Sequence, residues 1–474
     1  MWKKSYSRRE FIKKNSLTGL GAVLAMSSAT AASSFVSGDA GTPAIIGGSP
    51  VRTAGWPVWP FWDTAADEKF VVDVLRKGVW CRAGVDPRVS VVSEFERQYA
   101  EKLGSKRCLA VVNGTNSLII ALRMLDIGGG DEVIVTPYTF IATISAILEV
   151  GAMPVFADVD PATFQIRPEN IKKKITPATR AILPVHILGL PCDMPAIMDI
   201  AREHDLIVVE DACQAWLAEI NNRKVGTFGH AGCFSFQNTK HLAIGEGGAL
   251  ISDDDQFMDR CYSYHDTGSR YGRMDDLVGG IYVMRGNNLR MTEYQAAIGL
   301  AQMKRLDEQT TVRNINAAYL KPRLSDIPGI MPYELYDHVT RAAFHLFAFR
   351  YKKEEFSGMT RPEFLRALRA EGVPCSGGYS GNLNMMPYLD EAFKSKNYRN
   401  MYPAGDLNFE RFVEANRCPE SERLCNEEAV WLFQSMLLGE PEDMDDIFNA
   451  IEKIHRNSGK IKASLQEQSD NLSL

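Results

Sequence analysis

Lys240 is the residue of this chain whose type and setting most directly allow covalent chemistry. It lies between two short apolar segments, residues 233–236 and 249–251, which predict buried strands, and a glycine-rich turn leads into the second of them. Removing an amine from water lowers its pKa and leaves the neutral form free to attack a carbonyl group. The setting predicts a catalytic lysine, and an ordinary loop lysine is the alternative.

A glycine-containing turn suited to phosphate follows another predicted strand. Residues 108–112 run into Asn-Gly-Thr-Asn and then into an apolar-periodic helix at 117–125. Gly114 lets the backbone approach a ligand closely, and the first amides of the helix, joined by the Thr115 hydroxyl, bind a phosphate well. A simple helix cap is the alternative.

A carboxylate follows the predicted strand at residues 206–210. Asp211 at the exit of a buried strand is unfavourable unless it meets a cation, and a protonated pyridine nitrogen would serve. Gln214, three residues further on, is able to reach the same ligand. An aspartate that caps the next turn is the alternative.

An aromatic side chain follows the strand predicted at residues 132–136. The ring of Phe140 suits stacking on a flat cofactor, and a core position is the alternative. A phosphate cradle, a carboxylate, an aromatic plate and a lysine on successive strand ends together indicate pyridoxal 5'-phosphate (PLP) far better than any one of them does alone.

The elements that must position these residues alternate between strands and helices. Further strands are expected at residues 154–157 and 181–185, and further helices at 141–149 and 194–204. This alternation predicts an α/β fold with a largely parallel sheet that helices cover on both faces. Ligands of such sheets gather at the carboxyl ends of the strands.

The pattern divides the chain into four regions after the N-terminal segment. They are a linker and N-terminal arm at 32–66, a large PLP-binding domain at 67–317, a smaller C-terminal α+β domain at 318–457, and a polar tail at 458–474 that we expect to be disordered. In the smaller domain, helices are predicted at 361–370 and 420–432.

Composition excludes several classes of function. Of 474 residues, 45% are hydrophobic and 24% charged, which predicts a soluble globular protein. The net charge is -6; residues 1–31 contribute +5, so the remainder carries -11, which argues against nucleic acid as a partner. The nine cysteines are odd in number and contain no CxxC pair, so we expect free thiols and no metal site.

The first 31 residues have the three parts of a cleaved signal peptide. Six lysines and arginines precede an apolar stretch at 17–26, and small residues follow it. Residues 7–13, around Arg8 and Arg9, resemble the twin-arginine export signal, which carries proteins that are already folded. We therefore expect the twin-arginine export machinery as a partner and a periplasmic or otherwise exported protein; a basic start that stays attached is the alternative.

Seven segments, in one order, resemble a known family. Over residues 45–454 the chain is similar to the fold-type I PLP enzymes of the sugar aminotransferase group, the DegT/StrS family. The matching segments are NGTNSLIIAL, GDEVIVTPYTFIAT, PVFADVD, VHILGLPCDM, VVEDACQA, FSFQNTKHLAIGEGG and GNNLRMTEYQAAIGLAQ.

The resemblance implies a role for each site residue. Lys240 forms the internal aldimine and shuttles a proton between Cα and the cofactor, Asp211 pairs with the pyridine nitrogen, Gln214 contacts the ring near its hydroxyl, and Phe140 stacks on it. The residues implied to hold the phosphate are Gly114, Thr115, Asn116 and Ser235, together with Asn288 from the neighbouring subunit, which implies a homodimer with shared active sites. In the implied reaction, glutamate or glutamine donates an amino group that passes to a keto-sugar or keto-cyclitol.

The chain also departs from the family. Tyr379 and Asn384 lie in the segment expected near the substrate, and Asn384 stands where the family often has histidine, so a nucleotide-linked sugar is not implied. The segment at residues 46–48 resembles the branch that acts on inososes. Two alternatives remain: a PLP-dependent sugar dehydratase, although such members tend to replace the lysine or add an iron-sulfur cluster, and a PLP-binding regulatory or sensor protein without turnover.

Overall fold

The computed structural model of the protein describes residues 41–272 and 281–472. These described residues belong to one compact unit. The predicted signal peptide and most of the predicted linker lie outside the described residues. Among the described helices, all are too short or too polar to cross a bilayer.

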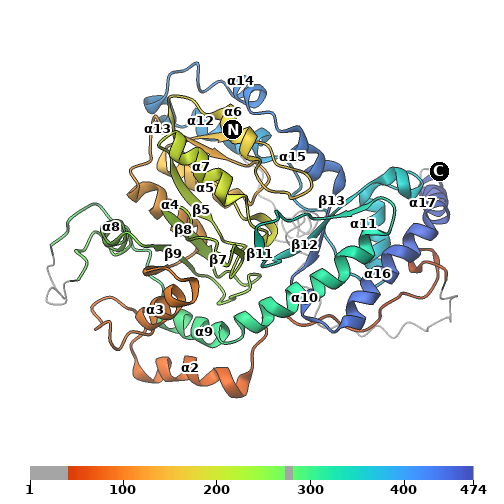
Figure 1. Ribbon diagram of the computed structural model, residues 1–474, viewed down its shortest axis with the longest axis horizontal. Helices are drawn as coiled ribbons and strands as arrows, with labels where there is room; N and C mark the ends of the chain where they lie inside the picture. The colour runs from red at the N-terminus through yellow and green to blue at the C-terminus, as the bar shows by residue number, and fades with distance from the viewer. Residues whose placement is uncertain (1–40, 273–280, 473–474) are drawn as a thin grey trace, which may run out of the picture. The chain divides into compact units, whose positions relative to one another are not determined.

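Seven strands form the central sheet, in the order β1, β9, β8, β5, β4, β2, β3 (Figure 1). In chain order they are β1 (Arg107–Val111), β2 (Glu132–Val135), β3 (Met153–Phe156), β4 (Thr179–Leu183), β5 (Ile207–Asp211), β8 (Ala231–Ser235) and β9 (Gly248–Ser252). Strand β9 is antiparallel to both of its neighbours, whereas β8, β5, β4, β2 and β3 are parallel. The predicted α/β fold with a mainly parallel sheet is confirmed.

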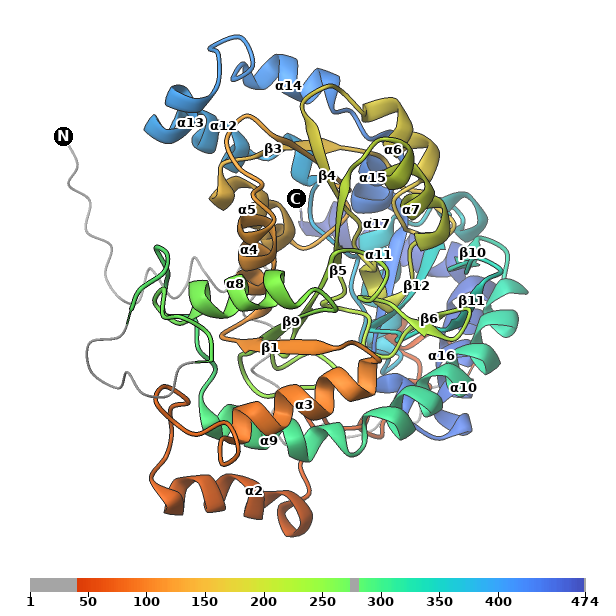
Figure 2. The same ribbon diagram turned by 60° about the vertical axis from the view of Figure 1, so that its left-hand side comes forward.

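Helices cover both faces of this sheet. They are α3 (Val91–Leu103), α4 (Gly114–Met124), α5 (Ile141–Val150), α6 (Pro168–Lys174), α7 (Met194–Glu203), α8 (Asp255–His265) and α9 (Glu293–Met303), and α2 (Thr64–Lys77) packs on the outer side of α9. Figure 2 shows α4 and α8 on one side of β1 and β9, with α3 and α9 on the other.

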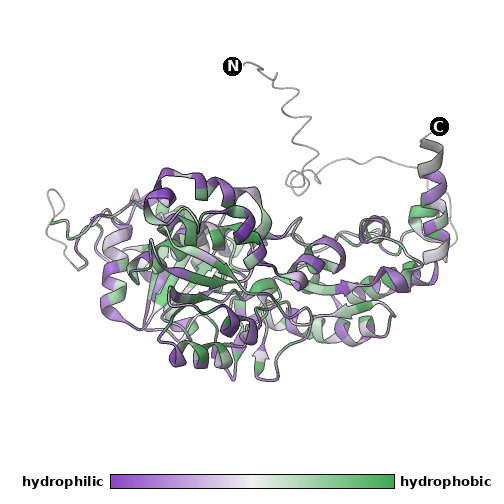
Figure 3. Ribbon diagram, turned by 90° about the horizontal axis from the view of Figure 1, so that it is seen from above, coloured by the Kyte–Doolittle hydropathy of each residue, from purple (hydrophilic) through white to green (hydrophobic). Residues whose placement is uncertain are grey.

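Alternate residues of a strand serve the two faces. In β2, Val133 and Val135 pack into the core beneath α4, α5 and α8, whereas Ile134 packs into the core beneath α3, α7 and α9. Figure 3 shows the apolar strands enclosed by helices whose outer faces are polar. A strand buried on both faces reads as a continuous apolar run, which is why these strands are visible in the sequence.

The long helix α10 (Leu306–Ser325) leads to a second, antiparallel sheet, in the order β10 (Ile330–Pro332), β12 (Leu346–Tyr351), β13 (Ala429–Phe433). The helices in this part of the chain are α11 (Arg361–Ala370), α12 (Pro387–Lys394), α13 (Lys396–Met401), α14 (Phe409–Ala415), α15 (Pro419–Arg423) and α16 (Pro441–Arg456). A small sheet joins β6 (Glu219–Ile220), β7 (Arg223–Lys224) and β11 (Val339–Arg341). The predicted helix at 361–370 is confirmed, and the domain boundary expected between residues 317 and 318 lies inside α10.

The helix predicted at residues 420–432 is confirmed for its first part and wrong from residue 429 onward. Helix α15 ends at Arg423, one wide turn follows at Leu424–Glu428, and the chain then enters β13. Val430 and Leu432 are fully buried and pair with Phe349 and Phe347 of β12. An apolar run of this length is compatible with a helix or with a buried strand, and here tertiary pairing decides.

The expected disorder of the C-terminal tail is also wrong for its described residues. Residues Ser458–Leu472 form helix α17. Ile461 and Leu465, one turn apart, are buried against the core, and Lys462 forms an ion pair with Glu363 at 3.0 Å. Two apolar residues on one face suffice to dock a helix that is otherwise polar.

Candidate active site

Lys240 lies in the loop that joins β8 to β9, at the carboxyl end of β8. The residue is half-buried, and its amide donates to the carbonyl of Gln237 at 2.8 Å. Burial lowers the pKa of the Lys240 amine, and the neighbouring Cys213 and Asp211 partly offset that effect. The predicted placement of this lysine between two buried strands is therefore confirmed.

Asp211 is the last residue of β5 and is almost fully buried. Its carboxylate accepts hydrogen bonds from the Thr143 hydroxyl at 2.8 Å and from the Cys213 amide at 3.1 Å. Thr143 in turn contacts Thr139 at 2.9 Å, so helix α5 holds the carboxylate in one orientation. A carboxylate fixed in this way beside Lys240 is available to a cationic ring nitrogen.

Gln214 and Tyr379 meet at the same edge of the sheet. The Gln214 side-chain oxygen accepts from the Leu188 amide at 2.9 Å. Burial raises the pKa of Tyr379, and a hydrogen bond with the Gln214 side chain works against that rise. The Tyr379 ring packs edge-on against Trp431 at 4.9 Å, so the C-terminal part of the chain contributes this phenol to the site.

The start of α4 is packed tightly against the end of β8. A Cβ added at Gly114 would lie 2.6 Å from Cβ of Ser235 and 2.8 Å from Sγ of Cys213, so only glycine fits there. Gly248 approaches Asn113 just as closely, since a Cβ there would lie 2.3 Å from its carbonyl carbon. Three separate segments thus converge on the N-terminus of one helix.

The amides of that helix start divide into two groups. The side chain of Asn113 accepts from the Asn116 amide at 2.9 Å, so this amide is already used by the cap. The amides of Gly114 and Thr115 precede it and have no intrahelical acceptor, as at any helix start. With the Ser235 hydroxyl beside them, they could hold a phosphate, and we call this place the cradle at Gly114.

Phe140 precedes α5 and is 57% exposed, which leaves its ring available to a ligand. Asn288 is exposed, and its amide bonds to the side chain of Asn287 at 2.8 Å. Asn384 does not join the group: it is fully buried and its side-chain amide donates to the carbonyl of Asn416.

Sequence reasoning missed three residues of this region. Thr143 and Cys213 contact Asp211, and Trp59 donates a hydrogen bond to the Lys240 carbonyl at 3.1 Å. Thr143 and Cys213 lie inside two of the family segments, three residues after Phe140 and two after Asp211. No local signal marks Trp59, which is 181 positions away from the lysine.

The residues present fit PLP. The cradle at Gly114 suits its phosphate, the buried carboxylate of Asp211 suits its protonated ring nitrogen, and the Lys240 amine suits its aldehyde. A seven-stranded, mainly parallel sheet with these residues at its edge defines a PLP-dependent aminotransferase of fold type I. Residues 63–413 match the DegT/DnrJ/EryC1/StrS aminotransferase family, and the chain belongs to it.

Known proteins show the same likeness. The L-glutamine:2-deoxy-scyllo-inosose aminotransferase of Streptoalloteichus tenebrarius is 34% identical over 432 residues, which cover 89% of this chain and 99% of that protein. The structure of an aminotransferase from Psychrobacter cryohalolentis is 32% identical, covers 85% of this chain and 100% of its own, and has a TM-score of 0.73. The Escherichia coli GDP-4-keto-6-deoxy-D-mannose-3-dehydratase, solved with bound hydrated PLP, is 25% identical, with 84% and 100% covered and a TM-score of 0.71.

Proposed function

We propose that this aminotransferase moves an amino group from glutamine or glutamate to the keto group of a cyclitol or a free keto-sugar. The observation that carries the proposal is the desolvated Lys240 amine beside Asp211 and the cradle at Gly114. A relative similar over almost its whole length is named for L-glutamine and 2-deoxy-scyllo-inosose, which supports this donor and a keto-cyclitol acceptor. The burial of Asn384 removes it from contact with an acceptor and supports one without a nucleotide.

Each residue has a role in this chemistry. When bound, PLP withdraws electrons from the carbon that carries the transferred amino group. The Lys240 amine, whose pKa burial lowers, would take the proton from Cα and pass it to the cofactor. Asp211, oriented by Thr143, would hold the ring nitrogen, and the exposed Phe140 ring would be available to stack on the ring.

The test is a screen of amino donors and keto acceptors with purified, PLP-loaded protein. We expect glutamine or glutamate to bleach the visible absorbance of the cofactor and a keto-cyclitol to restore it, with a new amine detected by mass spectrometry. Lys240→Ala abolishes both changes, whereas Thr239→Ala, at the exposed neighbouring position, retains them. If no amino donor bleaches the cofactor, the regulatory alternative is favoured. A deoxygenated product without nitrogen would favour the dehydratase.

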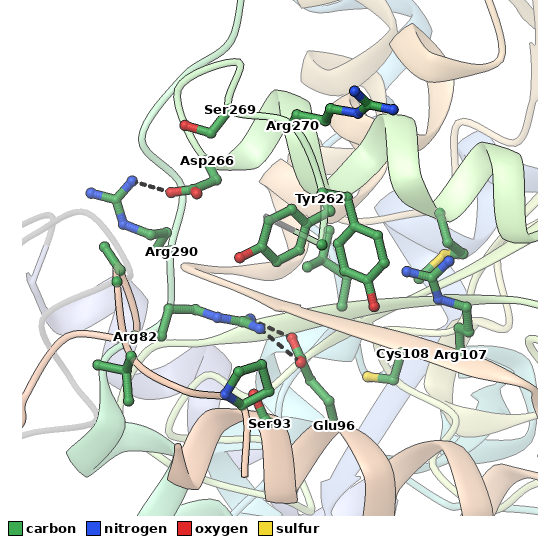
Figure 4. Close-up of a pocket in the computed structure, with 18 of the residues that line it drawn as sticks. Arg82, Ser93, Glu96, Arg107, Cys108, Tyr262, Asp266, Ser269, Arg270 and Arg290 are labelled. Carbon is green, nitrogen blue, oxygen red and sulfur yellow. Dashed lines mark hydrogen bonds and ion pairs between the residues drawn. The ribbon is translucent and has the colours of Figure 1, made fainter. Parts of the chain in front are cut away.

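We infer that the active unit is a homodimer with shared sites. Asn288 is exposed, and the nearby Arg290 forms an ion pair with Asp266 in the wall of a cavity of about 680 Å³ (Figure 4). This cavity lies between α3, β1 and α8, and Tyr271 and Tyr282 in its lining are exposed. None of the predicted cofactor residues lines it, which supports a role in subunit contact rather than catalysis.

Mixing two inactive variants tests the shared site. Lys240→Ala and Asn288→Ala, refolded together, give hybrid dimers with one intact site and a partial recovery of activity. Recovery fails if each subunit supplies its own asparagine.

Export through the twin-arginine pathway is the last part of the proposal, and the basic residues 7–13 support it. We expect Arg8→Lys with Arg9→Lys to leave the protein in the cytoplasm while the folded protein still binds PLP. Unchanged export of this double variant would refute it.

A further inference from the structure

The N-terminal arm, residues 41–63, is fastened to the C-terminal part of the chain. Arg52 forms an ion pair with Asp446 at 2.8 Å, on α16. Trp56 donates its indole N–H to the carbonyl of Gly372 at 2.9 Å, and the guanidinium of Arg52 lies 4.0 Å from the centre of its ring. The arm therefore has a fixed anchor before it reaches the large domain.

The next tryptophan of the arm reaches the backbone of the catalytic lysine. Trp59 donates its indole N–H to the carbonyl of Lys240 at 3.1 Å. On the other side of that peptide, His241 is buried, with its ring 5.1 Å from that of Trp216. Residues 238 and 239, just before Lys240, are exposed, and Trp59 and His241 lie against the loop on the side that follows the lysine side chain.

Arg313 of α10 packs against the indole ring of Trp59. Its guanidinium carbon lies 5.3 Å from the centre of the indole ring, and its Nε donates to the side-chain oxygen of Gln434 at 2.9 Å. The side chain is fully buried, and among the described residues no carboxylate pairs with it. Burial lowers the pKa of Arg313 to about 9. A buried charge with neutral partners is unfavourable, and an aromatic face is one of the few groups that compensate it.

We propose that Trp59 is a positioning residue for Lys240. Its indole N–H fixes the Lys240 carbonyl, and Arg313 holds the indole in place. The inference rests on the role of Lys240 proposed above. A reactive group must be held to within a fraction of an ångström to react efficiently, and a backbone bond at the lysine itself limits how far its amine can move. The same bond limits movement of the loop, and a looser loop would admit more water to the amine and raise its pKa.

The chain offers a matched control. Trp56 and Trp59 lie on the same arm, each donates to a backbone carbonyl, and each carries an arginine on its ring, but only Trp59 contacts the lysine loop. Trp59→Phe and Trp56→Phe therefore remove the same kind of bond. Incorporation of benzothienylalanine at position 59 removes only the N–H and keeps the size of the ring, so it protects the test against a folding defect.

The measurement is the rate at which cofactor-free protein captures added PLP, followed by visible absorbance across a range of pH. We expect both changes at Trp59 to slow capture by about threefold to tenfold, the worth of one neutral hydrogen bond, and to move the pH profile upward because water reaches the amine. Trp56→Phe should leave rate and profile unchanged.

Wild-type capture and an unshifted pH profile with benzothienylalanine at position 59 would overturn the inference and reduce Trp59 to a packing residue. Equal slowing in Trp56→Phe would overturn it as well, since the effect would then belong to the arm in general. Lys240→Ala separates the two proposals: if that protein develops the wild-type absorbance, the role of Lys240 is wrong, whatever Trp59 does.

Discussion

Gly114→Ala should separate the binding of the cofactor's phosphate from the binding of its ring. The added methyl group would lie 2.6 Å from Cβ of Ser235 and 3.2 Å from its Cα, whereas non-bonded carbon atoms prefer roughly 3.5–4.0 Å. Strand β8 is paired on both sides, with β5 and β9, and cannot yield easily. The start of α4 must therefore move by about 1 Å, away from the position that suits a phosphate.

Two effects set the expected losses of stability and of PLP affinity in Gly114→Ala. Overpacking of this kind costs about 1–3 kcal/mol, and alanine regains up to about 1 kcal/mol as a better helix former, so the free energy of unfolding should fall by about 1–2 kcal/mol. Displacement of the two free amides should weaken PLP binding by about tenfold, or about 1.4 kcal/mol. Pyridoxal, which lacks the phosphate, should bind as it does to the wild type.

The assay compares dissociation constants for PLP and pyridoxal with urea unfolding of the cofactor-free protein. Gly128→Ala is the control, because a Cβ there meets only the carbonyl oxygen of Val150, at 3.5 Å. Wild-type affinity for PLP in Gly114→Ala, or an equal loss for PLP and pyridoxal, would show that this helix start does not hold the phosphate.

Three further predictions concern the carboxylate, the lysine and the tail. Thr143→Val removes the hydroxyl that orients Asp211 and should lower kcat/KM by about tenfold or more, the worth of a hydrogen bond to a charged group; an unchanged value would mean that α5 does not position the carboxylate. Burial lowers the pKa of Lys240 and Asp211 raises it, so PLP capture should have its midpoint below the usual lysine range, and Asp211→Asn should shift that midpoint further down; an upward shift would contradict the assignment. Truncation after residue 457 exposes the surface that Ile461 and Leu465 cover and should lower the free energy of unfolding by about 3–5 kcal/mol, whereas an unchanged urea midpoint would mean that α17 is not docked.

Residues that follow a buried strand were predictable from the sequence. Asp211 and Gly114 are visible because one residue separates each of them from the end of an apolar run, and the carboxyl ends of parallel strands share one edge. Thr143 and Trp59 were not predictable in the same way. Their bonds depend on how α5 packs against the sheet and on where the arm lies, and both are properties of the tertiary structure.

The two wrong elements have a common physical cause. The apolar run at β13 and the polar segment at α17 both carry local patterns that leave their state open, and each is decided by a partner far away in the sequence. Residues 429–433 become a strand because β12 presents an open edge, and α17 is ordered because two of its residues find the core. The sequence pattern predicts an element correctly where the spacing of its own apolar residues matches the face that is buried. It fails where contacts with a distant partner decide between helix, strand and disorder.

Strand β9, which is antiparallel to its neighbours in the central sheet, explains why the site residues meet where they do. Because β9 runs opposite to β1 and β8, it begins at the edge of the sheet where those two strands end, and Val111, Gly248 and Ser235 form one row across the sheet. Gly248 has no side chain, so the turn after Val111 lies directly against the start of β9. The loop between β8 and β9 must then stay at this same edge, and Lys240 within it comes close to Asp211 at the end of neighbouring β5. If β9 ran parallel to β8, the connection between them would have to cross to the opposite edge of the sheet, away from the carboxylate and the phosphate cradle.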